Sequence, residues 1–291
     1  MAPTMLVGSF IAGSTSVGGG AVAFPVMTLV LDIDPPIARD FSLMIQSVGM
    51  GAASIAIVLM GIRVQWTVVI WANLGGLLGI AIGYQIAAIL SPPLIKMLFV
   101  SLWFALALAL YLINRGGRDV VEHIDHYSVS RLLALFAVGI VGGIVSGLTG
   151  SGLDVLTFAL MTMVFHLSES IATPTSVVVM ASNAIAGVAL RILGPGVHPE
   201  AIVYWWSAVP VVVIGAPVGA WYIKNKSRDF ILYILYTAIA VQFVGALMIV
   251  PQTTTTLAIV VATILLGALS FLAMNRLAAT QLTHASQEAS H

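Results

Sequence analysis

The sequence predicts an all-α polytopic membrane protein with two homologous repeats, each starting with a glycine-rich broken hairpin, and one extra C-terminal transmembrane helix. Of the 291 residues, 60% are hydrophobic and only 8% are charged, against about 25% charged residues in soluble domains. Most apolar runs exceed the roughly 18 to 20 residues that a helix needs to cross a bilayer. Glycine clusters interrupt two of these runs near their middle. Together these observations exclude a soluble globular protein.

Nine apolar segments separated by short polar breaks fill most of the chain. They span residues 5–31, 37–60, 66–90, 93–113, 131–167, 171–193, 201–223, 229–250 and 254–275. The polar stretch 114–130 carries five charged side chains and two histidines, which is typical of an aqueous linker. We therefore divide the chain into repeat 1 (1–113), this linker, repeat 2 (131–250), an extra helix (254–275) and a polar tail (276–291).

The two halves match when one is moved along the other by 134 residues. At this offset Gly8, Phe24 and Trp71 meet identical residues at 142, 158 and 205. After a two-residue insertion, an offset of 136 pairs Gly79 and Gly83 with glycines at 215 and 219. The pattern indicates an internal duplication, and the segment 254–275 lies outside it.

The first segment of each half is interrupted where a spanning helix should be uniformly apolar. Segment 5–31 contains GSTSVGGG and segment 131–167 contains SGLTGSGLD. Glycine costs about 1 kcal/mol relative to alanine inside a helix, so each cluster predicts a break. The second half-helix is expected to begin near Gly18–Ala21 in one repeat and near Gly152–Val155 in the other.

The distribution of Lys and Arg distinguishes full crossings from hairpins. If all nine segments cross, the basic residues divide five against six, which gives no orientation. If both broken segments are hairpins, one face receives eight of them and the other receives only Arg39, Lys96 and Arg191. The hairpin topology makes the repeats inverted, as in transporters, with linker and C-terminus cytoplasmic in a cell inner membrane. Parallel repeats remain the alternative.

The two breaks supply the candidate substrate-binding residues, because helix N-termini and glycine backbone favour oxyanions. Small-residue helix packing is the alternative explanation of the same clusters. The amides Gln46 and Asn183, near the middle of the second segment of each repeat, could bind substrate oxygens or bond between helices. The candidate residues are Ser14, Thr15, Ser16, Gly18, Gly19, Gly20, Gln46, Thr149, Gly150, Ser151, Gly152 and Asn183.

Asp154 is the one carboxylate that the sequence places deep in an apolar run, and such residues are functional candidates. It could cap the half-helix that follows the break, since Asp is favoured there. It could instead carry a coupling proton. Its counterpart in the first repeat is Gly20, so an acid function would belong to one half only.

Other motifs point to structure rather than chemistry. Thr173-Pro174 is typical of an N-cap and first helical position, and His166 and His198 are interpreted as interfacial. Arg39 is expected to extend to the interface, and recruitment of an anion toward the cavity is the alternative. We expect no nucleic-acid partner, because 11 basic and 11 acidic residues balance, and no metal, because the chain has no Cys and its histidines lack the company of other ligands. We expect no cofactor and no enzyme activity, since the phosphate-loop and catalytic-serine motifs are absent from the sequence.

The segments GSFIAGSTSVGGGAVAFP and GGIVSGLTGSGLDVLTF resemble the duplicated glycine signature of the sulfite exporter TauE/SafE family. ATPTSVVVMASNAIAG and GAPVGAW are also similar to that family, and the resemblance extends over about residues 5–250. It implies a transporter of small anions, commonly sulfite, sulfoacetate or related sulfur compounds, in a bacterial inner membrane.

We therefore expect a secondary transporter that exports a small anion, most simply sulfite or an organosulfur oxyanion, by alternating access. A permease for another anion such as a carboxylate, or a membrane scaffold subunit that transports nothing, are the alternatives. The expected partners are the anionic substrate and the lipid bilayer, and a homodimer stays open.

Overall fold

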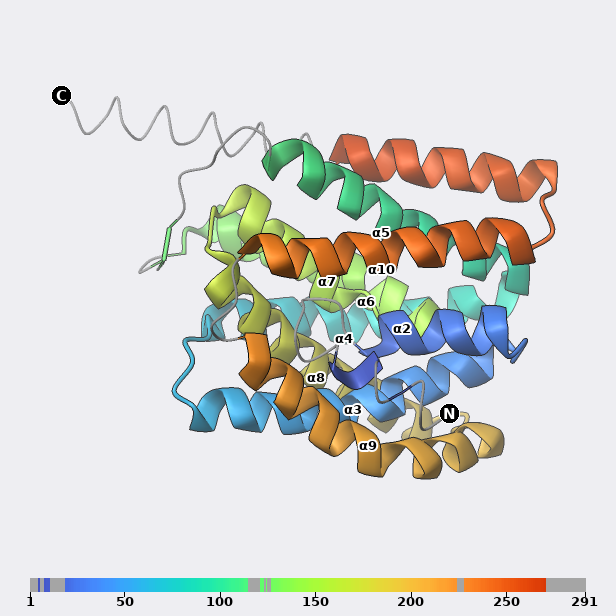
Figure 1. Cartoon of the computed structure of the whole chain (residues 1–291), viewed down its shortest axis with the longest axis horizontal. Coiled ribbons are helices and arrows are strands. Elements are labelled where there is room, and N and C mark those ends of the chain that lie inside the picture. Colours follow the sequence, from blue (N-terminus) through green and yellow to red (C-terminus); the bar gives the residue numbers. More distant parts are fainter. Residues whose placement is uncertain are drawn as a thin grey trace.

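A computed structural model of the chain describes residues 5, 8–10, 19–114, 121–122, 124, 127–223 and 228–270, and the named elements over them are helices. Six of these helices, α3, α4, α5, α6, α8 and α9, are long and apolar enough to cross a membrane. The protein is thus a polytopic membrane protein (Figure 1). In chain order the elements are α2 Gly19–Pro25, the π-helix η1 Val26–Val30, α3 Pro35–Leu59, α4 Trp66–Ile89, α5 Pro92–Asn114, α6 Val129–Thr149, α7 Leu153–Ala159, the π-helix η2 Leu160–Val164, α8 Glu169–Leu193, α9 Pro199–Ile223, α10 Arg228–Ile249 and a last helix Thr254–Ser270.

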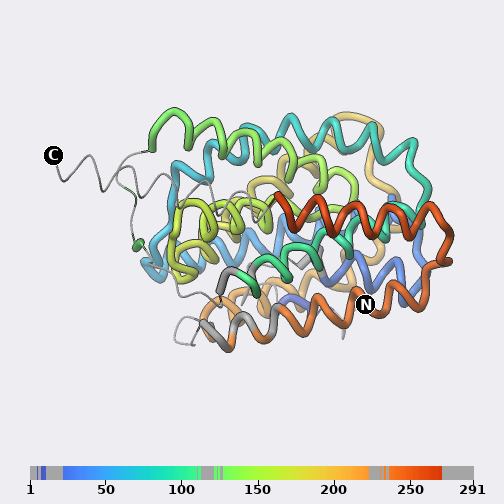
Figure 2. Tube along the Cα trace, turned by 90° about the horizontal axis from the view of Figure 1, so that it is seen from above, coloured from blue at the N-terminus to red at the C-terminus, as the bar shows by residue number. Residues whose placement is uncertain are grey.

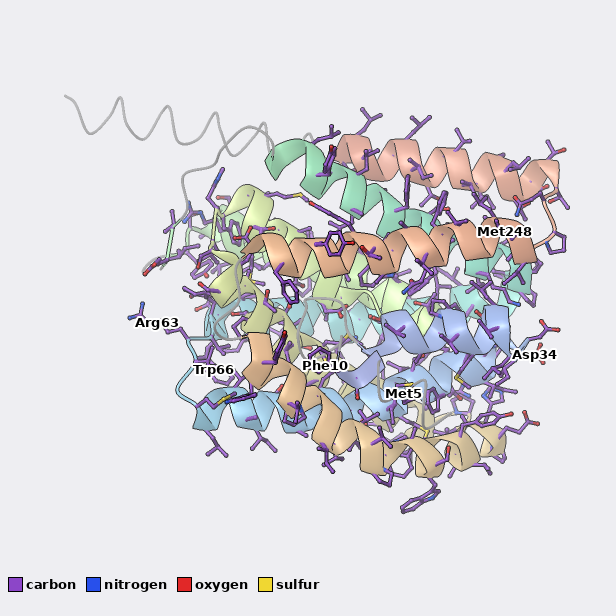
Figure 3. The ribbon with its side chains drawn as sticks, viewed as in Figure 1. Met5, Phe10, Asp34, Arg63, Trp66 and Met248 are labelled. Carbon is purple, nitrogen blue, oxygen red and sulfur yellow. The ribbon has the colours of Figure 1, made fainter. Side chains whose placement is uncertain are left out.

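The long helices lie side by side, so their ends gather at two ends of the molecule (Figures 1 and 2). Arg63 and Trp66 lie at one end, which we call end A, and Asp34 and Met248 lie at the other, which we call end B (Figure 3). The loop between α3 and α4 is at end A, whereas the loops between α8 and α9 and between α4 and α5 are at end B.

Helices α4 and α6 pack through glycines. A Cβ atom on Gly79 would lie 2.1 Å from the carbonyl oxygen of Ile140 and 2.9 Å from the Cα of Gly143. These are backbone atoms that cannot move aside, so only glycine permits this approach. The other glycines whose Cβ would meet backbone of the facing helix are Gly75, Gly83, Gly139, Gly143 and Gly147. Because they pair in ascending order, α4 and α6 run parallel.

The chain reverses between α6 and α7. Gly150 and Gly152 have φ angles of +87° and +150°, which side-chain-bearing residues rarely adopt. Helix α7 then lies back against α6, and a Cβ on Gly142 would be only 2.8 Å from the Cα of Leu153. Farther along, the ring of Phe165 lies 6.0 Å from the ring of Tyr127 and 5.7 Å from the guanidinium of Arg131. The segment 129–165 therefore begins and ends at end A.

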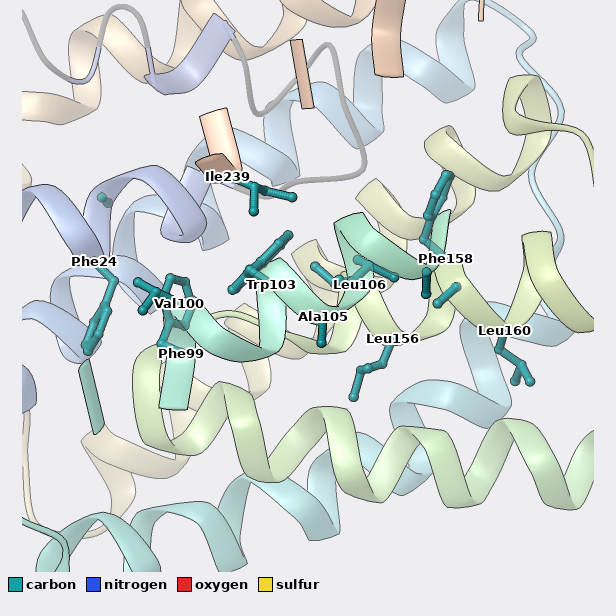
Figure 4. Packing of buried hydrophobic residues seen from close by; sticks show 14 of the residues in the cluster. Phe24, Phe99, Val100, Trp103, Ala105, Leu106, Leu156, Phe158, Leu160 and Ile239 are labelled. Atoms are coloured by element: carbon teal, nitrogen blue, oxygen red, sulfur yellow. The ribbon is translucent and has the colours of Figure 1, made fainter. Parts of the chain in front are cut away.

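Helix α7 lies in the core, and all seven of its residues are buried. Leu156 and Phe158 belong to the same buried cluster as Phe24 of α2 and Trp103 of α5 (Figure 4). The rings of Phe24 and Phe99 lie 5.2 Å apart. The α7–η2 segment is thus surrounded by protein, which satisfies the condition for irregular backbone at membrane depth, whereas η1 ends at the exposed Val30.

Elements of the two halves recur at a constant spacing. Helices α2 and η1 begin and end 134 residues before α7 and η2, and α3 stands in the same relation to α8. Thr28 Oγ1 donates to the carbonyl oxygen of Phe24, and Thr162 Oγ1 donates to that of Phe158, both at 2.8 Å. The spacing equals the offset at which the sequences match.

Helix α3 and the helices α4, α5, α8, α9 and α10 begin and end within two residues of the apolar segments in the sequence. The predicted start at Thr173-Pro174 is wrong, because α8 begins at Glu169 with Ser168 as its N-cap. The first turn consists of polar residues that precede the apolar run. Pro174 lies inside the helix, where the Oγ1 of Thr175 donates to the carbonyl oxygen of Ile171 at 2.7 Å.

Candidate functional site

The reversal Gly150–Gly152 forms a tip buried against the N-terminal part of α3. The side-chain amide nitrogen of Gln46 donates to the carbonyl oxygen of Gly150 at 2.6 Å and to that of Ser42 at 2.9 Å. A Cβ on Gly150 would lie 2.6 Å from the Cβ of Ser42. Gln46 is thus an interhelical tie between α3 and the tip, while its other amide atom, Oε1, has no partner within the described part of the chain.

Side chains on both sides of the reversal accept hydrogen bonds from backbone N–H groups at the start of α7. The N–H of Leu153 donates to Ser146 Oγ, and the N–H of Gly152 donates to Asp154 Oδ1, each at 3.2 Å. Thr149 Oγ1 donates to the carbonyl oxygens of Val145 and Ser151. The backbone N–H groups of Gly152 and Leu153, which we expected to bind an oxyanion, are therefore occupied by side chains of the protein itself.

Asp154 is completely buried in the first turn of α7. Its carboxylate lies where the positive end of a helix stabilises a negative charge, and it accepts from the N–H of Gly152, which is the N-cap residue of α7. Asp154 thus lies inside the first turn rather than at the N-cap, and this geometry favours a structural role at the helix start over the proton-carrier role.

Buried polar atoms without a hydrogen-bond partner gather around the tip. Natural proteins pair nearly all such atoms, because each unpaired one costs roughly 1 to 3 kcal/mol. They come from α3, the tip, α7 and α8, so four separate parts of the chain contribute. Among the described residues these atoms are Ser42 Oγ, Gln46 Oε1, Ser151 Oγ, Thr157 Oγ1 and both amide atoms of Asn183.

Asn183 is the clearest of these groups. It is buried in α8, and its Oδ1 would lie 3.0 Å from a Cβ on Gly76 of α4. The same Cβ would lie 2.8 Å from Leu153 at the start of α7. The amide therefore faces a junction of three helices that has room only because position 76 is glycine.

A cavity of about 10 Å³, close to the size of one water molecule, lies beside the tip. Ser9, Gln46 and Gly49 line it together with Val212 and Ala216 of α9. Of the first break, Ser14, Thr15, Ser16 and Gly18 lie outside the described residues, and Gly19 and Gly20 form the first two positions of α2.

A buried charged cluster at end B was not predicted. Asp40, on α3, accepts a bond from Arg191 at 2.9 Å and from the backbone N–H of His198 at 3.2 Å, and lies 2.7 Å from His198 Nδ1. Arg39 lies 3.2 Å from the same carboxylate and 4.9 Å from the ring centre of Tyr84. We call Arg39, Asp40, Arg191 and His198 the end-B cluster.

Two expectations are corrected by this cluster. Arg39 does not extend to the interface, because it is only 5% exposed and is held by Asp40 and Tyr84. His198, in the loop before α9, remains partly exposed and also contacts Asp40. Asp154 is not the one deeply buried carboxylate, since the side chain of Asp40 is equally inaccessible. The sequence contained a signal for this cluster, because the predicted hairpin topology places Arg39 and Arg191 on the same side of the membrane.

Two further observations concern His166 and metal binding. The backbone oxygen of His166, beyond η2, accepts from Val121 at 2.8 Å. Within the described residues, no group of three or more His, Asp or Glu could hold a metal ion.

Comparison with known proteins gives one match. The family model described as "Sulfite exporter TauE/SafE" matches residues 1–244. No curated protein and no solved structure matches the chain.

Proposed function

The chain belongs to the sulfite exporter TauE/SafE family, and on that premise we propose that it is a secondary transporter that exports a small oxyanion by alternating access. The family makes it a membrane permease of the sulfite or anion exporter type rather than an enzyme. Sulfite or an organosulfur oxyanion is the proposed substrate. A carboxylate is the alternative.

The transport architecture we propose has inverted repeats, each starting with a re-entrant hairpin. The 134-residue recurrence of α2, η1 and α3 supports the duplication. The contact of Phe165 with Tyr127 supports a hairpin in the second half, since the segment returns to the end where it began. An odd number of crossings in each repeat then relates the halves by inversion.

End A is proposed to be cytoplasmic and end B external. Arg63 lies in the α3–α4 loop at end A (Figure 3), Arg131 lies in the first turn of α6, which starts at that end, and α10 starts there at Arg228 (Figure 1). The linker 114–130 also connects there and carries two more arginines. Basic residues favour the cytoplasmic side in bacterial membranes.

The buried tip of the second hairpin is the proposed substrate site. The observation that carries this proposal is Asn183, whose amide has neither a donor nor an acceptor partner in the described part of the protein. A polar ligand would satisfy it together with Ser42, Gln46 and Ser151. Ser14, Thr15, Ser16 and Gly18–Gly20 are proposed to approach the anion from the first hairpin.

The narrowness of the space beside Gln46 supports alternating access. It has room for about one water molecule, so in this proposal the helices around Gln46 shift before an oxyanion enters. Export requires no nucleotide, because moving one negative charge out of an inside-negative cell is favourable by about 2.3 kcal/mol per 100 mV.

The test is counterflow of labelled sulfite into proteoliposomes that contain Asn183→Leu. Removing an unpaired amide should leave the protein as stable as the wild type or slightly more stable, yet abolish sulfite exchange. Asn73→Leu in α4 is the matched control, because this amide already donates to its own helix at Val69. It should keep exchange.

Wild-type exchange by Asn183→Leu would refute the proposed site. Exchange of carboxylates but not of sulfite by the wild-type protein would favour the alternative substrate. Failure of the wild-type protein to move any tested anion would favour the scaffold alternative.

A further inference from the structure

The end-B cluster carries more positive than negative charge in a buried place. We propose that Arg39 and Arg191 form a second anion site at the external mouth of the transport path, where Asp40 is the resident counter-ion that the transported oxyanion displaces. The ligand class is the small oxyanion of the proposed function, on which this inference rests. The pairing of Asp40 with α8 and the α8–α9 loop then acts as a gate.

The charge balance is the first observation. Arg39 and Arg191 are 5% and 9% exposed, and both point over one ring, with guanidinium carbons 4.9 and 5.7 Å from the centre of Tyr84. Asp40 is the carboxylate that both contact, so the two arginines and this carboxylate carry a net charge of +1. A buried uncompensated cation is costly, and a second anion removes that cost.

An unused donor is the second observation. The Nε of Arg191 is buried and has no partner in the described part of the chain, although its Nη2 reaches Asp40 and approaches His198 Nδ1 at 3.3 Å. A guanidinium offers a planar fork of donors that matches the geometry of an oxyanion. An incoming oxyanion can therefore take Nε first and then compete for the donor that Asp40 holds.

The cluster adjoins the tip of the second hairpin. The carbonyl oxygen of Arg39 would lie 2.7 Å from a Cβ on Gly150. Ser42, three residues farther along α3 and so on the same face, has a buried Oγ without a partner in the described structure. An anion that leaves the tip towards end B thus meets Ser42 and then the two arginines.

Displacement of Asp40 would loosen end B. Its carboxylate is bonded to Arg191 at the end of α8 and to His198 before α9, so it clamps the start of α3 to both. End A has no such clamp at the related positions. The residues 134 positions away from Arg39, Arg191 and His198 are Thr173, Ile57 and Val64.

Closure at end A uses neutral groups instead. The N–H of Gln65 donates to Thr175 Oγ1 at 3.0 Å, and Tyr127 donates to Gln65 Oε1 at 3.2 Å. Burial raises the pKa of Tyr127 to about 12, so its phenol remains a donor at every physiological pH. Within the described residues, the charged, anion-responsive gate therefore lies at end B.

Titration of the purified full-length protein with sulfite, followed by tryptophan fluorescence, tests the proposal. Asp40→Asn removes the competing carboxylate and should tighten sulfite binding about 10-fold. Arg191→Gln should weaken it roughly 10- to 100-fold, the range expected for loss of a charged hydrogen bond. Lys96→Gln, which removes a cation at the same end that is paired with Thr28 and the exposed Asp32, is the matched control and should leave the affinity unchanged.

A purely structural ion pair predicts otherwise. Asp40→Asn and Arg191→Gln would then lower the unfolding temperature while each folded variant bound sulfite with wild-type affinity, and that result would overturn the proposal. If Arg191→Gln does not fold, Arg191→Lys keeps the charge but loses the fork, and should still weaken binding about 10-fold. Wild-type affinity in Arg191→Lys counts against the site.

The two proposals fail separately. If the wild-type protein exchanges sulfite in proteoliposomes and the cluster variants bind it normally, the gate is wrong and the transport function stands. If the wild-type protein neither binds nor exchanges any oxyanion tested, the proposed function is wrong.

Discussion

Replacing Gly150 by alanine tests whether the hairpin tip is held as tightly against α3 as its geometry requires. At φ +87° an L-residue costs roughly 1 to 2 kcal/mol. The new Cβ would also lie 2.6 Å from Ser42 Cβ and 2.7 Å from the carbonyl oxygen of Arg39, and overpacking of this kind costs about 1 to 3 kcal/mol. Gly150→Ala should therefore lose about 2 to 5 kcal/mol of unfolding free energy.

Gly196 is a matched control for the conformational part of that loss. Its φ is +86°, and a Cβ there would meet no atom within 4 Å, so Gly196→Ala should lose only about 1 to 2 kcal/mol. Unfolding of both variants in detergent can be followed by the fluorescence of the six tryptophans. Equal losses in the two variants would show that the tip is free to move away from α3, and the packing that defines the site would be wrong.

Three further predictions concern the cap, the glycine interface and the topology. Asp154→Asn should keep sulfite exchange and its pH dependence, because the amide oxygen can still accept from Gly152, and a loss of pH-driven accumulation would restore the proton-carrier role. Gly79→Ala should destabilise the protein by about 1 to 3 kcal/mol or more, whereas Gly245→Ala, with open space around it, should stabilise it by up to about 1 kcal/mol, and similar thermal shifts would contradict the close approach of α4 and α6. Single cysteines Ser128→Cys and Ser91→Cys, in a chain without native cysteine, should react with an impermeant maleimide from opposite faces, and labelling from one face would contradict the arrangement of ends A and B.

The helices and the second break could be predicted because their causes are local. Apolar runs of bilayer length determine where helices such as α4 lie. The break at Gly150–Gly152 follows from glycines in backbone conformations that other residues avoid, and α7 begins at Leu153, inside the expected range. The start of α8 was missed because its first turn, Ser168 to Ser170, is polar and lies outside the apolar run.

The end-B cluster could not be derived from local sequence, because a charge near a helix end has two outcomes. Arg39 lies within two turns of the start of α3, where a long side chain can extend to the interface. Whether the side chain stays buried depends on the neighbouring helix, which here is the end of α8, more than 150 residues away along the chain. The sequence likewise could not predict that Asn183 lacks a hydrogen-bond partner in the described structure, since a buried amide usually bonds to a neighbouring helix.

The charges break the symmetry that the repeated helices suggest, and they do so in a consistent direction. At the tip, Asp154 occupies the start of α7, so an anion beside it is repelled, whereas the corresponding position in the first half is Gly20. Towards end B two arginines attract the same anion, and towards end A the closing groups in the described part of the chain, Gln65, Thr175 and Tyr127, are neutral. Two arginines alone would hold an oxyanion too firmly for turnover. Asp40 prevents this because it returns to Arg191 as the anion leaves, so attraction draws the substrate to the mouth and the resident carboxylate releases it. If end B faces outward, as the basic residues favour, the two arginines lie at the exit of an export path, and the inside-negative potential supplies the driving force.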